Sequence, residues 1–310
     1  METLAVVLEK PERLVLDRLE LSPPEAEDVV VDIAWSGVST GTERLLWSGD
    51  MPAFPGMGYP LVPGYESVGW IAEAGERSGA RVGEFVFVPG ARCFGEVRGL
   101  FGGAAARLVV AGERVIALDS TLGERGVLMA LAATAHHAIA EGCPDLIVGH
   151  GVLGRLIARL TLVMGESAPT VWEQNPDRAG TAEAYSVVHP DDDPRQDYNR
   201  ICDVSGDHDI LDSLIGRLAP GGEITLAGFY SKPLSFAFPP AFLREARLRV
   251  SAEWRDTDLA AVCRLVESGQ LSLDGLITHR AEAARAEPAY RTAFNDSSCL
   301  KMILDWRHCQ

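Results

Sequence analysis

The stretch DLIVGHGVLG, residues 145–154, decides the fold of half the chain, because a short apolar run leads directly into a GxGxxG turn. The run Asp145–Val148 predicts a buried strand, and the apolar positions of Arg155–Val163 recur at helical spacing. A strand, a glycine turn and a helix in this order are typical of a dinucleotide-binding Rossmann unit. The stretch therefore predicts a parallel α/β domain that binds a nucleotide.

Each glycine of the turn has a physical purpose in such a unit. Gly149 is expected to form the tight turn, Gly151 to let backbone N–H groups reach a pyrophosphate, and Gly154 to let the helix pack closely on the strand. The residues predicted to border the cofactor here are Gly149, His150, Gly151, Val152, Leu153 and Gly154.

Further predicted cofactor contacts lie where other apolar runs end. The run Thr170–Trp172 ends in Glu173, 24 residues after Gly149, where a carboxylate can accept both ribose hydroxyls and repel a 2′-phosphate. This favours NAD over NADP, although Glu173 can also be read as a solvated carboxylate at a strand end. Two later strand ends add Ser205, Gly228 and Phe229, which are either cofactor neighbours or ordinary loop residues.

The composition and the hydrophobic periodicity of the chain change near residue 120. Residues 1–120 carry short β-branched or alternating runs between Gly- and Pro-rich loops, which indicates a small all-β unit. Residues 121–280 alternate helical segments with brief apolar strands, which predicts a doubly wound parallel sheet. Residues 281–310 add one helix and one last strand.

Composition excludes several classes of function. The chain has 310 residues and a formal net charge of −16, which repels phosphate backbones, so we expect no nucleic-acid partner. Its apolar runs are shorter than the ~18 residues of a membrane span, and no signal-peptide pattern is present, so a cytoplasmic protein is expected. The six cysteines have no paired spacing and read as reduced thiols.

Three motifs, together with the order of the two domains, resemble the medium-chain dehydrogenase/reductase family. They are SGVSTGTE at residues 36–43, with one residue inserted relative to the family pattern, LVPGYESVG at 61–69 and TAHHA at 134–138. The resemblance implies a GroES-like β-barrel catalytic domain of residues 1–120 completed by 281–310, and a Rossmann NAD-binding domain of residues 121–280. It also implies a homodimer joined through the edge segment Phe236–Leu243 and Arg247–Trp254.

The zinc ligands of the family do not match. Members that use zinc hold it with a Cys, a His and a Cys, Asp or Glu; the resemblance aligns these positions with Ser36, Tyr65 and Ala130, and only Glu66 offers a carboxylate nearby. A hydroxyl, a phenol and a methyl do not suit a metal that prefers thiolate and imidazole. The segment Pro89–Phe101, where relatives have four structural cysteines, contains Cys93 alone. No metal is therefore expected.

Within the family, residues 39–69 look most like the dehydrogenases of bacteriochlorophyll synthesis. That resemblance implies a bacteriochlorin as substrate, whose 3-(1-hydroxyethyl) group is oxidised to 3-acetyl with NAD. A Pro-stiffened loop with flat aromatic side chains suits such a macrocycle, although it can also be read as ordinary packing. The predicted substrate-binding residues are Trp35, Trp47, Phe54 and Tyr59. The competing functions are a zinc-free quinone or enoyl reductase that uses NADPH, and a nucleotide-binding relative without catalysis.

Without a metal, hydrogen bonds and an acid/base group must handle the alcohol proton. The candidates are Thr42, Glu43, Tyr65, Glu66, His136 and His137. Each has a structural alternative: the first two can cap a short helix, the next two can form a buried pair, and adjacent histidines on a helix diverge by ~100° and cannot both face one ring.

Overall fold

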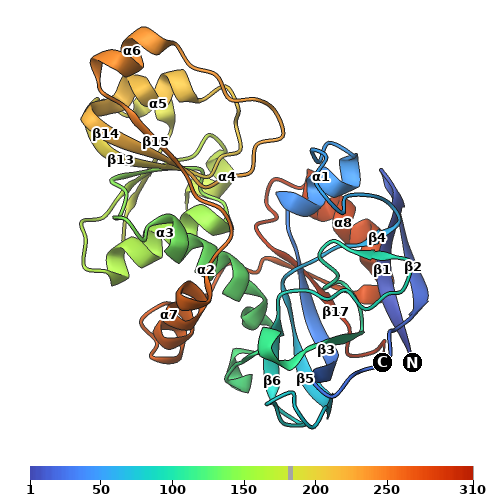
Figure 1. Ribbon diagram of the computed structural model, residues 1–310. Coiled ribbons are helices and arrows are strands. Elements are labelled where there is room, and N and C mark those ends of the chain that lie inside the picture. The colour runs from blue at the N-terminus through green and yellow to red at the C-terminus, as the bar shows by residue number, and fades with distance from the viewer. Residues whose placement is uncertain (181–183, 310) are drawn as a thin grey trace. The chain divides into compact units, whose positions relative to one another are not determined.

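The computed structural model describes residues 1–180 and 184–309 and divides the chain into two compact units. The first unit consists of Met1–Ala130 and Asp274–Gln310, and the second of Leu131–Leu273. Figure 1 shows both units, with the N- and C-terminal segments side by side in the first.

The second unit is built on a six-stranded sheet in which all neighbouring strands run parallel. Helices cover both faces, with α3 (Val152–Val163) on one and α5 (Leu211–Arg217) on the other (Figure 1). The strands, in spatial order, are β12 (Ser186–Val188), β11 (Thr170–Trp172), β10 (Leu146–Val148), β13 (Tyr198–Asp203), β14 (Leu218–Leu226) and β15 (Arg247–Val250). This sheet confirms the predicted α/β class.

The register of the sheet brings the carboxyl ends of its central strands together. Val148 pairs with Trp172 on one side and with Asp203 on the other, and Asp203 pairs in turn with Leu226. The next residues of four strands therefore lie along one edge, which is where parallel sheets bind ligands. A buried apolar cluster that includes Leu146 and Ile224 fixes this register from beneath.

The first unit contains a seven-stranded and a four-stranded sheet. The long strand β3 (Asp28–Val38) is central to the larger sheet, because it pairs with β5, β8 and β17. The larger sheet consists of β16 (His279–Glu282), β17 (Met302–Asp305), β3, β5 (Ser67–Ala74), β6 (Phe85–Val88), β9 (Ile116–Ala117) and β8 (Arg107–Ala111). The smaller sheet consists of β2 (Arg13–Glu20), β1 (Glu2–Lys10), β4 (Leu61–Val62) and β7 (Arg98–Gly99).

Helices complete both units. Short α1 (Thr42–Ser48) follows β3, and α8 (Ala286–Asn295) precedes β17, so the predicted last helix and last strand are confirmed. Other helices are α2 (Met129–Ala138), α6 (Phe238–Leu243) and α7 (Asp256–Glu267). Among the described residues, no helix has the length and apolar character required to cross a bilayer.

Candidate functional site

The glycine turn after β10 has the geometry that its sequence predicts. Gly149 adopts a φ of +103°, a conformation that favours glycine, and its N–H donates to Trp172 O at 2.9 Å. A Cβ on Gly154 would lie 1.9 Å from Gly149 O, so the helix can approach the strand only with glycine there. A Cβ on Gly151 would meet no heavy atom within 4 Å, which leaves its surface open.

The side chain of His150 points into the protein and stabilises the glycine turn through hydrogen bonds. Its side chain is fully buried; Nδ1 donates to Arg178 O at 2.7 Å and Nε2 accepts from Tyr185 Oη at 2.8 Å. Burial and then the nearby Arg155 charge lower the pKa of His150 to about 4, so the imidazole is neutral at pH 7. The guanidinium of Arg155 donates to His150 O at 3.0 Å and to Arg178 O at 2.9 Å. Of the predicted cofactor residues, His150 can therefore contribute its backbone only.

Glu173 lies beside this turn, as predicted. Its Oε2 accepts from the His150 backbone N–H at 3.1 Å, and its Oε1 accepts from the Asn175 N–H at 2.8 Å. A carboxylate oxygen can accept more than one hydrogen bond, so both oxygens retain the capacity to accept from a diol. The carboxylate is thus oriented by the loop that would hold the pyrophosphate.

Asp203 organises the next strand end. Its side chain is fully buried; Oδ1 accepts from the Ser205 N–H at 2.9 Å and Oδ2 accepts from Tyr230 Oη at 2.6 Å. Its carbonyl accepts from the Gly228 N–H at 3.1 Å, which ties the ends of β13 and β14 together. Burial raises the pKa of Asp203. Phe229 follows with 53% of its surface exposed.

In the first unit, two hydroxyls meet where β3 ends and β5 begins. Tyr65 Oη and Ser39 Oγ lie 2.9 Å apart, and the Tyr65 ring stands edge-on to Phe101. The Thr42 N–H donates to Ser39 Oγ at 3.3 Å. Burial, followed by the Glu66 charge, raises the pKa of Tyr65 far above its usual value, so Tyr65 remains protonated at neutral pH. The pair can donate a hydrogen bond to an oxygen, and it can pass a proton from one hydroxyl to the other.

Glu43 lies beneath this pair and is fully buried. Its Oε1 accepts from the Ser39 N–H at 2.9 Å, and its Oε2 accepts from Tyr290 Oη, on α8, at 2.5 Å. Burial raises the pKa of Glu43 to about 7, against the lowering effect of the Tyr290 hydrogen bond. Tyr290 was not predicted, because its partner lies 247 positions away in the sequence.

The second acidic candidate, Glu66, forms a buried ion pair with a lysine that is distant in the sequence. Glu66 is 0% exposed, and Lys301, its partner, is 2% exposed. Lys301 Nζ donates to Glu66 Oε2 at 2.6 Å and to Oε1 at 2.9 Å. The predicted alternative of a buried Tyr65–Glu66 pair is wrong, because each of these two side chains has a different partner.

One alignment that the resemblance suggested is also wrong. Ser36 Oγ accepts from Trp306 Nε1 at 2.8 Å and is buried, whereas Ser39 lies against Tyr65. The donor set at this place is therefore the hydroxyl of Ser39, the phenol of Tyr65 and a carboxylate already engaged by Lys301. These groups do not fit a zinc ion, which prefers thiolate and imidazole ligands.

His136 and His137 share one partner within the second unit. Their Nδ1 atoms each lie 2.8 Å from an oxygen of Asp258, on α7. Asp258 is 5% exposed and also accepts from the Arg255 backbone N–H at 2.9 Å, which caps the helix. Because the carboxylate occupies both Nδ1 positions, the predicted proton acceptor could act only through an Nε2 atom.

The four aromatic residues predicted to bind substrate have different surroundings. Trp47 packs against Phe294 with a centroid distance of 5.6 Å, and Tyr59 donates to the carbonyl of Leu46, so both lie around α1. Phe54 is 37% exposed.

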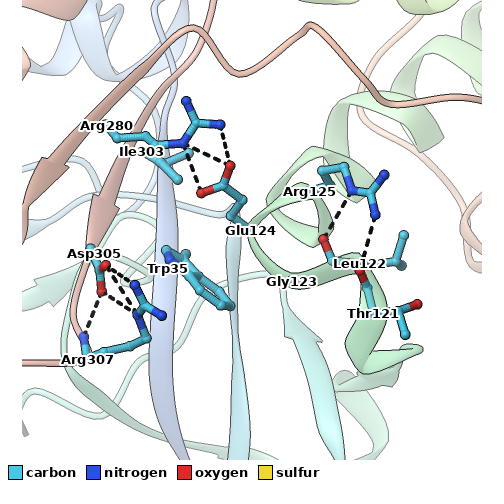
Figure 2. Close-up of a pocket in the computed structure, with 10 residues that line it drawn as sticks. All are labelled: Trp35, Thr121, Leu122, Gly123, Glu124, Arg125, Arg280, Ile303, Asp305 and Arg307. Atoms are coloured by element: carbon cyan, nitrogen blue, oxygen red, sulfur yellow. Dashed lines mark hydrogen bonds and ion pairs between the residues drawn. The ribbon is translucent and has the colours of Figure 1, made fainter.

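Trp35 instead lines a pocket of about 450 Å³ in the first unit, which Figure 2 shows. There the Arg307 guanidinium lies 4.8 Å from the Trp35 ring, and the ion pairs Arg280–Glu124 and Arg307–Asp305 border the cavity.

Among the described residues, the one cluster of three potential metal ligands is Asp207, His208 and Asp209, a largely exposed loop after β13. Acidic surface loops of this kind are common without an ion.

Comparison with known proteins places this geometry in context. Residues 25–120 match the alcohol dehydrogenase GroES-like domain. A 2-desacetyl-2-hydroxyethyl bacteriochlorophyllide A dehydrogenase of Rhodobacter capsulatus is 57% identical over 311 residues, with 99% of each chain covered. One of the same name from Cereibacter sphaeroides is 54% identical over 315 residues, again with 99% of each covered. Among solved structures, an Escherichia coli alcohol dehydrogenase in complex with NADH has a TM-score of 0.84 at 21% identity, covering 98% of this chain and 99% of its own.

Proposed function

This chain belongs to the medium-chain dehydrogenase/reductase family, and from that premise we propose that it oxidises the hydroxyethyl group of a bacteriochlorophyllide to an acetyl group, with NAD as the acceptor. The observation that carries the proposal is its likeness, along the whole chain, to two relatives named for this substrate. The glycine turn adds support, because this oxidation needs a hydride acceptor and the geometry of the turn suits a nicotinamide dinucleotide.

The second unit would hold the cofactor, which accepts a hydride when bound. Backbone N–H groups at the start of α3 suit the pyrophosphate, and Gly151 leaves room for its approach. Glu173, held by two N–H donors, suits the ribose hydroxyls and repels a 2′-phosphate. We therefore propose NAD rather than NADP.

The first unit would manage the oxygen of the alcohol. Oxidation removes a hydride from the carbinol carbon and a proton from its oxygen, and the developing oxygen charge needs a hydrogen-bond donor. Tyr65 meets this need because it stays protonated: it would accept the alcohol proton as it passes its own to Ser39, from which a proton leaves to water, and it would then donate to the carbonyl oxygen formed. The ligand set described above does not suit zinc, so we propose that no step depends on a protein-bound metal.

The test is turnover of purified protein with hydroxyethyl bacteriochlorophyllide. NAD should support formation of the acetyl product, NADP should support it poorly, and a chelator should leave the rate unchanged. A rate that requires added zinc would contradict the metal-free proposal, and binding of NAD without any product would favour a non-catalytic relative. A Tyr65→Phe variant should lose most of its kcat, with NAD affinity retained.

We also propose a homodimer formed through β15. This strand ends the six-stranded sheet, and large apolar side chains are exposed on it and on the preceding helix. They are Phe238 (67%), Phe242 (66%), Leu243 (77%), Leu248 (40%) and Val250 (76%). A two-fold pairing of β15 with its copy would cover both the strand edge and this patch. Light scattering should give the mass of a dimer for the wild type and of a monomer for Val250→Lys.

A further inference from the structure

Lys301 carries a charge into the interior of the first unit. A buried ammonium is costly unless it is paired and its hydrogen bonds are satisfied. Lys301 meets this condition with two contacts to the Glu66 carboxylate, at 2.6 and 2.9 Å. Glu66 is in turn packed against β3 so closely that a Cβ on Gly37 would lie 2.1 Å from its Oε2. The ion pair is therefore fixed in position as well as neutralised.

A third contact of Lys301 connects the pair to the other side of the site. Its Nζ donates to Val38 O at 3.3 Å. Val38 immediately precedes Ser39, and Glu66 immediately follows Tyr65. A single ammonium thus holds two chain segments, each at the residue next to one member of the hydroxyl pair.

The same ion pair acts electrostatically on Glu43. The charged and titratable groups that face Glu43 are Tyr290 from α8, Glu66 from the loop before β5, Lys301 from the segment before β17 and Tyr65. Glu66 raises the pKa of Glu43 and Lys301 lowers it, after the larger effects of burial and the Tyr290 hydrogen bond. The two partners of one ion pair therefore act on this carboxyl in opposite directions.

We infer that Lys301 is a positioning residue of the reaction site: by holding Val38 O and the Glu66 carboxylate it keeps Ser39 and Tyr65 in hydrogen-bonding contact, and together with Glu66 it acts electrostatically on Glu43 beneath them. Lys301 touches none of the atoms proposed to react, and it acts through its neighbours. The link to turnover rests on the proposed oxidation, whose proton leaves through the hydroxyl pair. The effect on Glu43 does not depend on any substrate.

Infrared titration of the Glu43 carboxyl band tests the electrostatic part without turnover, with the band assigned by its loss in Glu43→Gln. Lys301→Met, which keeps the length of the side chain and removes its charge, should raise the midpoint, because Lys301 lowers the pKa of Glu43. Glu66→Gln should lower the midpoint, and the double variant should lie near the wild type. A midpoint that stays constant, or that moves in the same direction in both single variants, would overturn the inference.

Turnover is the second readout. The pH midpoint of kcat should follow the infrared midpoint in each variant, while KM for NAD stays constant because the nucleotide turn is untouched. A merely structural role would lower the amount of folded protein without moving either midpoint. If Lys301→Met does not fold, Glu66→Gln is compared with the double variant instead. The titration midpoint of Glu43 must then be higher in the double variant than in Glu66→Gln. If even the wild type shows no turnover, the proposed function fails and the infrared titration still decides the role of Lys301.

Discussion

Two glycine-to-alanine substitutions in the nucleotide turn separate the stability of the loop from its capacity to bind a dinucleotide. In Gly154→Ala the new Cβ would lie 1.9 Å from Gly149 O and 3.0 Å from its carbonyl carbon. Both are backbone atoms, so β10 and α3 must move apart by about 1 Å or more. Overpacking of this kind costs about 1–3 kcal/mol. For a domain of this size the midpoint of thermal unfolding should fall by roughly 2–12 °C.

Gly151→Ala is the matched control. No atom of the chain lies within 4 Å of its new Cβ, and the backbone at φ −74° and ψ −170° accepts alanine. The apo protein should therefore keep its stability or gain about 0.4–1 kcal/mol from a stiffer unfolded chain. NAD affinity should nevertheless fall by tenfold or more, because the methyl group stands where the pyrophosphate approaches.

The assay combines differential scanning calorimetry of the apo proteins with calorimetric titration of NAD. We expect Gly154→Ala to lose both stability and affinity, and Gly151→Ala to lose affinity alone. Wild-type NAD affinity in Gly151→Ala would refute the location of the pyrophosphate. Unchanged stability in Gly154→Ala would refute the close contact of helix and strand.

Three further predictions concern charged groups. The pKa of Glu43 is raised from 4.5 to about 7 in the fold, so its contribution to stability is complete below pH 4.5 and is lost as pH rises through 7. Urea denaturation of the wild type should therefore show the free energy of unfolding fall by about 3 kcal/mol across that window. In Glu43→Gln this fall should be absent. Asp258→Asn should cost about 2–4 kcal/mol, measured in the same way, because one carboxylate caps α7 and accepts from two histidines. Glu173→Ala should weaken NAD binding about tenfold and reduce the ratio of NAD affinity to NADP affinity. If the wild type and Glu173→Ala bind NAD equally well, the proposed contact of Glu173 with the ribose is wrong.

The glycine turn of the second unit could be predicted from sequence because its requirements are local. The turn at Gly149, the close approach at Gly154 and the carboxylate of Glu173 all depend on residues at the ends of strands whose apolar runs are plain. The weaker strand Ser186–Val188 was not predicted, because it is short and only partly buried. The apolar run Glu223–Ala227 predicts a strand there, but β14 begins earlier, at Leu218, and passes through Gly221 and Gly222.

The polar contacts of the first unit could not be predicted in the same way, because the partners are distant in sequence. Nothing near Glu66 indicates that its counterion is Lys301, 235 positions away, or that Glu43 receives a hydrogen bond from Tyr290. From sequence alone, Lys301 reads as a surface residue and Tyr290 as a core residue. Their contacts with Glu66 and Glu43 form only because the C-terminal segment folds back onto the first unit.

The error at Ser36 shows how an insertion misleads an alignment of loops. The segment 36–43, which starts in β3, has one residue more than the family pattern, so either Ser36 or Ser39 could be matched to the family's cysteine. Trp306 resolves the choice, because its indole N–H needs an acceptor inside the first unit and Ser36 Oγ provides one. Ser39 is then left at the end of β3, where Lys301 holds the carbonyl of its neighbour and Tyr65 meets its hydroxyl. In the proposed reaction Ser39 is therefore the serine that assists the alcohol oxygen, so Ser39→Ala should slow turnover, whereas Ser36→Ala should lower stability.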